Sequence, residues 1–268
     1  MRKVILDRTF STNTEYKTSE RTVYVFRYIG TNLAENVTVK IDGKECGIIH
    51  SDIAPKHRNA DNLYGPLYLR ELFYVVPPET KFEFTSSSSG EVRVIGDLIL
   101  LDIGETAPGD LLTRFNEQHR HFYTVFSGSY TFGTDEAFAD GQEVTLFDKR
   151  NESNESFKLN HIAGVSVSNV SGYAQGQIGV RIYLNEVPYD TLDSSEGKFG
   201  IDSYNMPLPP TASVESRPFS FKVMPLEVPA DNRLRITAIN VSGGNLTPPS
   251  GSAISITFRA VAEYLRRV

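Results

Sequence analysis

The sequence predicts an all-β protein made of two tandem β-sandwiches joined by a short helix. Three observations lead to this prediction. Apolar and polar residues alternate with a period of two along most of the chain, and one run near the midpoint has helical spacing instead. A series of strand patterns in the first half also recurs, in the same order, in the second half. Many short strands separated by turn residues are typical of sandwiches and barrels.

Five segments of the first half have strand character. The alternation is clearest where Val37, Val39 and Ile41 are spaced by polar residues, and the following Asp42-Gly43 pair predicts a hairpin turn. Gly96 interrupts a later strand and predicts a bulge or a bend. The five predicted strands are residues 22–29, 37–41, 67–76, 81–85 and 91–103.

A short helix is predicted after Pro108, over residues 110–119. Asp110 is the expected N-cap, and Leu111, Leu112 and Phe115 form an apolar stripe at helical spacing. Because this segment lies near the midpoint, we expect a first domain at residues 1–107, a linker helix at 108–121 and a second domain at 122–268.

The second half returns to strand patterns and contains one long irregular segment. Residues 148–156 read as a polar loop. Residues 190–217 are rich in Ser and Pro and, with residues 51–65, are the longest predicted connections, which favours a contact-forming role. The predicted strands are residues 124–132, 142–147, 164–169, 178–184, 219–223, 234–239 and 253–265.

An internal repeat relates the two halves. Residues 76–84 (VPPETKFEF) align without gaps with residues 228–236 (VPADNRLRI), so Phe82 and Phe84 correspond to Leu234 and Ile236 on the core face. Flanking segments follow in the same order. Residues 22–29 match 164–169, residues 37–42 match 180–185, and residues 92–94 match 254–256.

The sequence contains no recognised catalytic motif, and we assign no catalytic, cofactor-binding or metal-binding residue. Cys46 is the single cysteine and reads as a small buried apolar side chain. His119 and His121 fall at the predicted helix end, where a spacing of two does not align side chains and a charged histidine is favoured. The acidic run at Asp135, Glu136 and Asp140 could supply oxygen ligands to Ca²⁺, but it lacks the EF-hand spacing and reads as a hairpin loop.

Net charge and the N-terminal residues bear on nucleic-acid binding and on the site of synthesis. The chain has 33 acidic and 27 basic residues, a net charge of −6, and no basic run, so we expect no direct sequence-specific binding of nucleic acid. The apolar run near the N-terminus, Val4-Ile5-Leu6, is too short for a signal-peptide core. We therefore expect synthesis in the cytoplasm. Six Asn-x-Ser/Thr sites read as a by-product of loop composition.

The tandem halves resemble the double jelly-roll major capsid proteins of tailless icosahedral phages. The resemblance rests on residues 76–94 with 228–256, on residues 37–43 with 180–186, and on the helix at 110–119. It implies two jelly rolls, a homotrimer of pseudo-hexagonal outline, contacts with neighbouring capsomers and other virion proteins, and no enzymatic activity. The implied location is the virion, and the implied function is to form the icosahedral capsid shell.

Two other functions stay open. A phage head-decoration, spike-base or tail accessory protein would have the same sequence properties. A carbohydrate-binding β-sandwich module would also be compatible, although the absence of Trp weakens this reading, because exposed Trp or Tyr side chains often form sugar-binding platforms.

Overall fold

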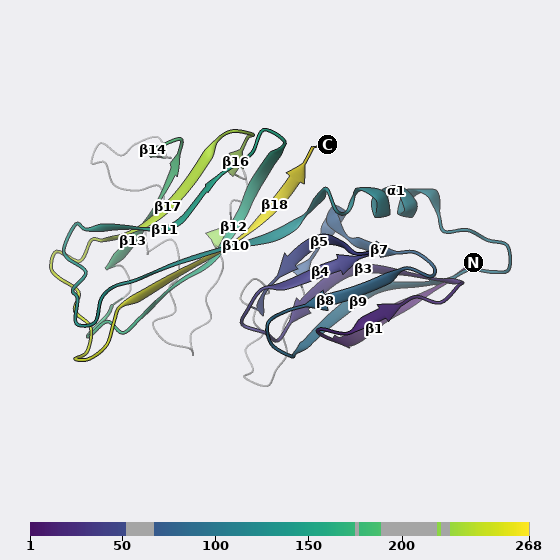
Figure 1. Ribbon diagram of the computed structural model, residues 1–268, viewed down its shortest axis with the longest axis horizontal. Coiled ribbons are helices and arrows are strands. Elements are labelled where there is room, and N and C mark those ends of the chain that lie inside the picture. Colours follow the sequence, from purple (N-terminus) through teal and green to yellow (C-terminus); the bar gives the residue numbers. More distant parts are fainter. Residues whose placement is uncertain (52–66, 175–176, 189–218, 221–225, 268) are drawn as a thin grey trace. The chain divides into compact units, whose positions relative to one another are not determined.

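The computed structural model describes residues 1–51, 67–174, 177–188, 219–220 and 226–267 (Figure 1). The predicted all-β class is confirmed, and the strands of these residues form four antiparallel sheets. The chain divides into two compact units, the first containing Met1–Val125 with Glu263–Arg267 and the second containing Phe126–Ala262. The domain limits expected from the sequence remain a prediction.

The first unit is a sandwich of two sheets. One sheet has the strand order β1-β9-β3-β6, with β7 also paired to β3, and the other has the order β2-β8-β4-β5. The bounds are β1 Arg2–Ser11, β2 Glu15–Lys17, β3 Thr22–Thr31, β4 Val37–Ile41, β5 Lys44–Ile49, β6 Leu67–Tyr68, β7 Tyr74–Val76, β8 Lys81–Thr85 and β9 Glu91–Leu100.

The second unit is also a two-sheet sandwich. Its sheets have the orders β10-β18-β12-β15, with β16 also paired to β12, and β11-β17-β13-β14. The bounds are β10 His121–Thr131, β11 Glu143–Arg150, β12 Glu155–Ser168, β13 Ile178–Leu184, β14 Val187–Pro188, β15 Phe219–Ser220, β16 Leu226–Val228, β17 Arg233–Asn240 and β18 Ser255–Arg266.

The two units have the same topology. Adding nine to every strand number of the first unit reproduces the two sheet orders of the second unit, including the side pairing of β7 with β3 as that of β16 with β12. Two facing sheets with this crossing order form a jelly roll. The prediction of tandem jelly-roll-like sandwiches is therefore confirmed.

The repeated sequence segments lie at equivalent places in this topology. Val76 ends β7 and Val228 ends β16, while Lys81 begins β8 and Arg233 begins β17. The other matched segments lie on β3 and β12, on β4 and β13, and on β9 and at the start of β18. The repeat in the sequence is thus a repeat of structure.

Aromatic and branched side chains fill the core of each sandwich. Phe10, Phe82 and Phe84 are buried in the first unit, where the rings of Phe10 and Phe82 meet edge to face at 5.2 Å. This geometry suits the charge distribution of aromatic rings. Leu234 and Ile236 are fully buried in the second unit, so the predicted core-facing residues of both repeats are confirmed.

The predicted helix exists, but its start differs from the prediction. Helix α1 spans Gly109–Glu117, and Pro108 rather than Asp110 occupies the N-cap position. Asp110 lies in the first turn, where its negative charge is favourable near the helix N-terminus. The predicted apolar stripe packs against Val23, Val25 and Ile99 on the outside of the sheet that contains β3 and β9.

Several other strand predictions need correction. The run at residues 67–76 is not one strand, because a 3-10 turn at Arg70–Leu72 separates β6 from β7. Strands β1 and β2 were not predicted, and β11 and β12 extend into the expected loop at residues 148–156. The long connections at residues 51–65 and 190–217 lie outside the described residues, apart from Ser51.

Candidate functional site

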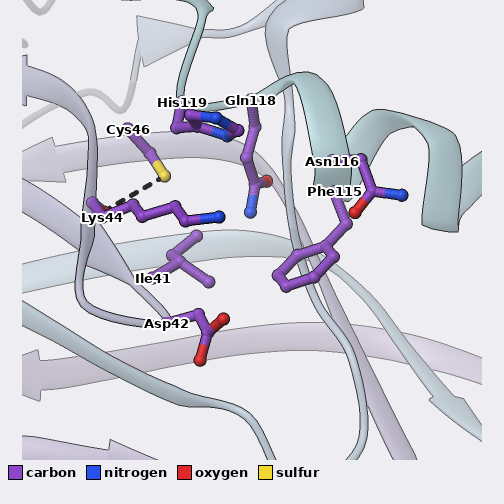
Figure 2. Close-up of a pocket in the computed structure, with 8 residues that line it drawn as sticks. All are labelled: Ile41, Asp42, Lys44, Cys46, Phe115, Asn116, Gln118 and His119. Atoms are coloured by element: carbon purple, nitrogen blue, oxygen red, sulfur yellow. Dashed lines mark hydrogen bonds between the residues drawn. The ribbon is translucent and has the colours of Figure 1, made fainter.

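A small pocket of the first unit lies where the β4–β5 turn approaches the end of α1 (Figure 2). Asp42, Lys44, Cys46 and His119 are among its lining residues. Its volume is about 20 Å³, which is room for about one water molecule. Pockets that bind organic ligands typically enclose about 300–1,000 Å³. This pocket therefore does not accommodate a substrate.

Two titratable groups of the pocket, the Cys46 thiol and the His119 imidazole, are shifted toward their neutral forms. Burial raises the pKa of the Cys46 thiol to about 12, and its sulfur donates to the carbonyl oxygen of Lys44 at 3.4 Å. Burial, with the nearby charge of Lys44, lowers the pKa of His119, opposite to the shift expected of a histidine at a helix C-terminus. Neither a thiolate nor an imidazolium is available here at neutral pH.

Two polar side chains of the α1 region contact the backbone of the first unit. Arg114 is buried and donates from Nε to the carbonyl oxygen of Phe73 at 2.8 Å and from Nη2 to that of His121 at 3.0 Å. Gln118 is buried beside β7. Sequence reasoning missed both residues, although their spacing of three and seven from Leu111 places them on the buried stripe.

His119 and His121 lie in different surroundings. His119 lines the pocket, whereas His121 lies in β10 with its Nε2 atom 2.8 Å from Oε1 of Glu263. In the described part of the chain, no group of three or more His, Cys, Asp or Glu residues is placed to bind a metal ion. The described residues also contain no helix long and apolar enough to cross a membrane.

The acidic run of the second unit stabilises loops. Asp135 accepts a hydrogen bond from the N–H of Gly251 at 2.7 Å, and Asp140 accepts one from the N–H of Gly243 at 3.0 Å. Glu136 accepts from the N–H of Gly133. Each carboxylate thus contacts a different backbone group, as expected for a hairpin loop.

The outer face of the β1-β9-β3-β6 sheet is partly covered and partly open. Helix α1 covers the part around Val25, while Tyr28 and Tyr68 are 37% and 50% exposed farther along. Their rings stack at 4.7 Å, and Tyr28 lies opposite Ile95 on β9. This stacked pair is therefore an exposed aromatic feature on the outer face of the sheet.

The outer face of the second unit's β11-β17-β13-β14 sheet carries an interlocked polar network. Glu143 accepts hydrogen bonds from Tyr183 and Thr237 at 2.7 and 2.5 Å and pairs with Arg181 at 3.1 Å. Burial opposes ionisation of Glu143, but these donors and the Arg181 charge outweigh it and lower its pKa. The guanidinium of Arg235 lies 4.1 Å from the centre of the Tyr183 ring.

Comparisons with known proteins reveal no family. No protein-family model and no curated protein matches the chain. Among solved structures, the capsid of PBCV-1 virus is 11% identical with a TM-score of 0.37, and the alignment covers 99% of this chain and 95% of that chain. At this identity and TM-score the likeness carries no argument about function, so the fold rests on the strand order itself.

Two further solved structures are similar to this chain with lower TM-scores. The turret protein A223 of Sulfolobus turreted icosahedral virus is 12% identical with a TM-score of 0.20, covering 99% of this chain and all of that chain. BuGH86, solved in complex with neoagarooctaose, is 10% identical with a TM-score of 0.24, covering 95% of this chain and 34% of that chain.

Proposed function

We propose that this chain is a structural protein of a virus particle and forms an icosahedral capsid shell by self-association. The observation that carries the proposal is the repetition of one jelly-roll strand order within a single chain. Jelly rolls are a common building unit of viral capsids. Three chains with two such units each would present six similar units, which is the basis for proposing a homotrimer of pseudo-hexagonal outline.

Exposed apolar side chains in the first unit support a role at surfaces. The described pocket has room for about one water molecule, and its Cys46 thiol is neutral. By contrast, Tyr28, Tyr68 and Ile5 are exposed on the sheet of the first unit. We therefore propose that the chain has no enzymatic activity and that its partners are other copies of itself and other virion proteins.

The proposal also covers where the chain is made and which kind of virus contains it. We propose that the chain is made in the cytoplasm of its host and resides in the virion, and that the virus is a tailless phage. A head-decoration, spike-base or tail accessory protein is the alternative within the same class. A shell protein forms closed particles or flat arrays by itself, whereas an accessory protein forms small oligomers only.

The mass and the shape of the purified protein test this proposal. Light scattering after gel filtration should give the mass of three 29.9-kDa chains, and electron microscopy should show shells or arrays at higher concentration. Small oligomers without arrays would favour the accessory role. A monomer at every concentration tested would contradict both.

A carbohydrate-binding module is the second candidate, and the stacked pair of Tyr28 and Tyr68 favours it. Exposed aromatic rings can stack on sugar rings, and the carboxylate of Asp7 and the guanidinium of Arg93 lie on the same face to supply hydrogen bonds. Calorimetry with soluble oligosaccharides would test this candidate. Binding that is lost in Tyr68→Ala, and unchanged in the control Tyr130→Ala on β10, would support it.

A further inference from the structure

Strand β1 forms one edge of its sheet. It spans Arg2–Ser11 and, among the residues that the structure describes, pairs only with β9 (Figure 1). The N–H of Thr12 donates to the carbonyl oxygen of Gly90 on the β9 side. Backbone groups alternate sides along a strand, so the odd-numbered residues direct their N–H and C=O groups toward the open edge. The N–H of Ser11, which donates to the Tyr16 hydroxyl, follows this alternation.

Oppositely charged side chains flank Ile5 at equal spacing along the open edge. Ile5 lies on the outer face of the sheet and is 83% exposed, the second most exposed large apolar side chain in the described residues after Ile103. Lys3 and Asp7 lie on the same face, two residues before and two residues after it. The edge therefore carries a positive, an apolar and a negative side chain in sequence.

We propose that two copies of the chain pair their β1 strands antiparallel about a two-fold axis at Ile5. This inference rests on the proposed self-association and names the surface that would join one capsomer to the next. In this register, Ile5 faces its own copy, and Lys3 of each copy faces Asp7 of the other. The odd-numbered residues of one β1 strand then lie opposite the odd-numbered residues of the other. Their N–H and C=O groups point toward each other, as a hydrogen-bonded antiparallel pair requires.

The charges on the outer face of the sheet favour this register over its neighbours. A shift of the axis to Lys3 or to Asp7 would place two like charges directly opposite, which is destabilising. In the proposed register, Arg2 and Arg8 also face each other on the opposite side of the sheet, and this like-charge contact offsets part of the gain from the two Lys3–Asp7 pairs.

The ion pairs already present in the first unit leave Lys3 and Asp7 able to turn toward a partner. Lys3 lies 3.0 Å from Asp97, but Asp97 also pairs with Arg27 at 2.7 Å and stays neutralised when Lys3 moves. Asp7 accepts two hydrogen bonds from Arg93 at 2.8 and 3.0 Å. A carboxylate has further lone pairs and can accept a third donor.

Cross-linking by introduced cysteines tests the register. In a Cys46→Ala background, Ile5→Cys should give a disulfide-linked dimer under mild oxidation, because directly paired residues have Cα atoms about 5.5 Å apart. Asp7→Cys alone should not cross-link, but an equal mixture of Lys3→Cys and Asp7→Cys proteins should. Lys17→Cys on β2, also exposed, is the matched control and should stay monomeric on non-reducing gels.

Charge reversal is the second test and does not depend on oxidation. Lys3→Asp or Asp7→Lys should raise the dissociation constant of the β1-paired dimer, measured by sedimentation, at least about tenfold. Combining Lys3→Asp with Asp7→Lys should return this constant to the wild-type value. Circular dichroism and thermal melting should show that each variant is folded. A double variant that stays as weak as the single variants would overturn the proposal.

The outcomes separate this inference from the proposed function. If Ile5→Cys does not cross-link while the wild-type protein still forms trimers or shells, β1 pairing is wrong and self-association stands. If the wild-type protein is monomeric throughout, both are wrong. Cross-linking at Ile5 together with the charge-swap rescue would establish the β1 contact.

Discussion

The side-chain amide of Gln118 forms two hydrogen bonds with the backbone of Val75, as a neighbouring strand would. The Val75 N–H donates to Oε1 at 2.8 Å, and Nε2 donates to the Val75 carbonyl oxygen at 3.0 Å. Strand β7 pairs with β3 on its other side. The residue that follows α1 thus covers a sheet edge that would otherwise have unpaired polar groups.

Substitution of Gln118 should therefore destabilise the first unit. Gln118→Ala leaves a buried N–H and a buried C=O without partners, which should lower the free energy of unfolding by about 2–4 kcal/mol. Urea titration followed by circular dichroism measures this change. Glu117→Ala, at an exposed position on the helix, is the control, and an equally large loss there would argue against the edge-covering role.

Gly96 is required by the close approach of two strands. A Cβ atom at this position would lie 1.9 Å from the carbonyl oxygen of Val25, next to the register shift between Phe26 and Tyr28 on β3. We expect Gly96→Ala to lower the free energy of unfolding by more than about 2 kcal/mol, because the backbone at Val25 must move to make room for the Cβ atom. Gly109→Ala has open space around it and should raise stability by up to about 1 kcal/mol. Chemical denaturation of both variants checks this ordering.

The polar network of the second unit predicts a loss of stability in acid. Hydrogen bonds from Arg233 lower the pKa of Asp148, and the donors around Glu143 lower its pKa despite burial. A carboxylate whose pKa is lower in the folded state stabilises the protein above the unfolded pKa of about 4. This contribution should be lost as the pH falls through the folded pKa values.

Thermal melting between pH 7 and pH 2.5 measures this dependence. The melting temperature should change little from pH 7 to 5 and fall below about pH 4. Glu143→Gln should melt lower than the wild type at pH 7 and lose less on acidification. Glu152→Gln, at an exposed turn position, should follow the wild-type curve. Identical acid profiles for wild type and Glu143→Gln would refute the role of Glu143.

Cys46 should be unreactive in the folded protein. Burial raises its thiol pKa to about 12, and only the thiolate attacks a disulfide reagent. At pH 8, reaction with an aromatic disulfide reagent should be at least about a hundredfold slower in buffer than in guanidinium chloride. Rapid labelling of the native protein would show that this part of the first unit opens readily.

The fold class was predictable because its signals are local. Apolar alternation predicts strands wherever one face is buried, and it correctly placed Phe82 and Leu234 in the two cores. The Asp42-Gly43 turn was also predictable, and both residues have positive φ. Strand β1 was missed because charged residues at Arg2, Lys3, Asp7 and Arg8 hide its alternation. Such charges are typical of an edge strand.

The helix start shows how local signals can mislead. Asp110 is a favourable N-cap residue, yet the helix begins at Gly109 with Pro108 in the cap position. Packing of Leu111 on the sheet core accompanies this start. A favourable N-cap residue stabilises a helix by about 1 kcal/mol. This is less than the free energy gained by burying an apolar stripe.

The sequence by itself determined that the chain forms strands, where most of them lie, and that the same unit occurs twice. Only the tertiary structure decided which strands pair and which side chains share a face. Arg2 lies opposite Leu100, and Glu143 meets Thr237. Such contacts join residues more than ninety positions apart, so no local pattern encodes them. They are selected by the packing of all strands together, because each pairing must also leave the rest of the sandwich able to close.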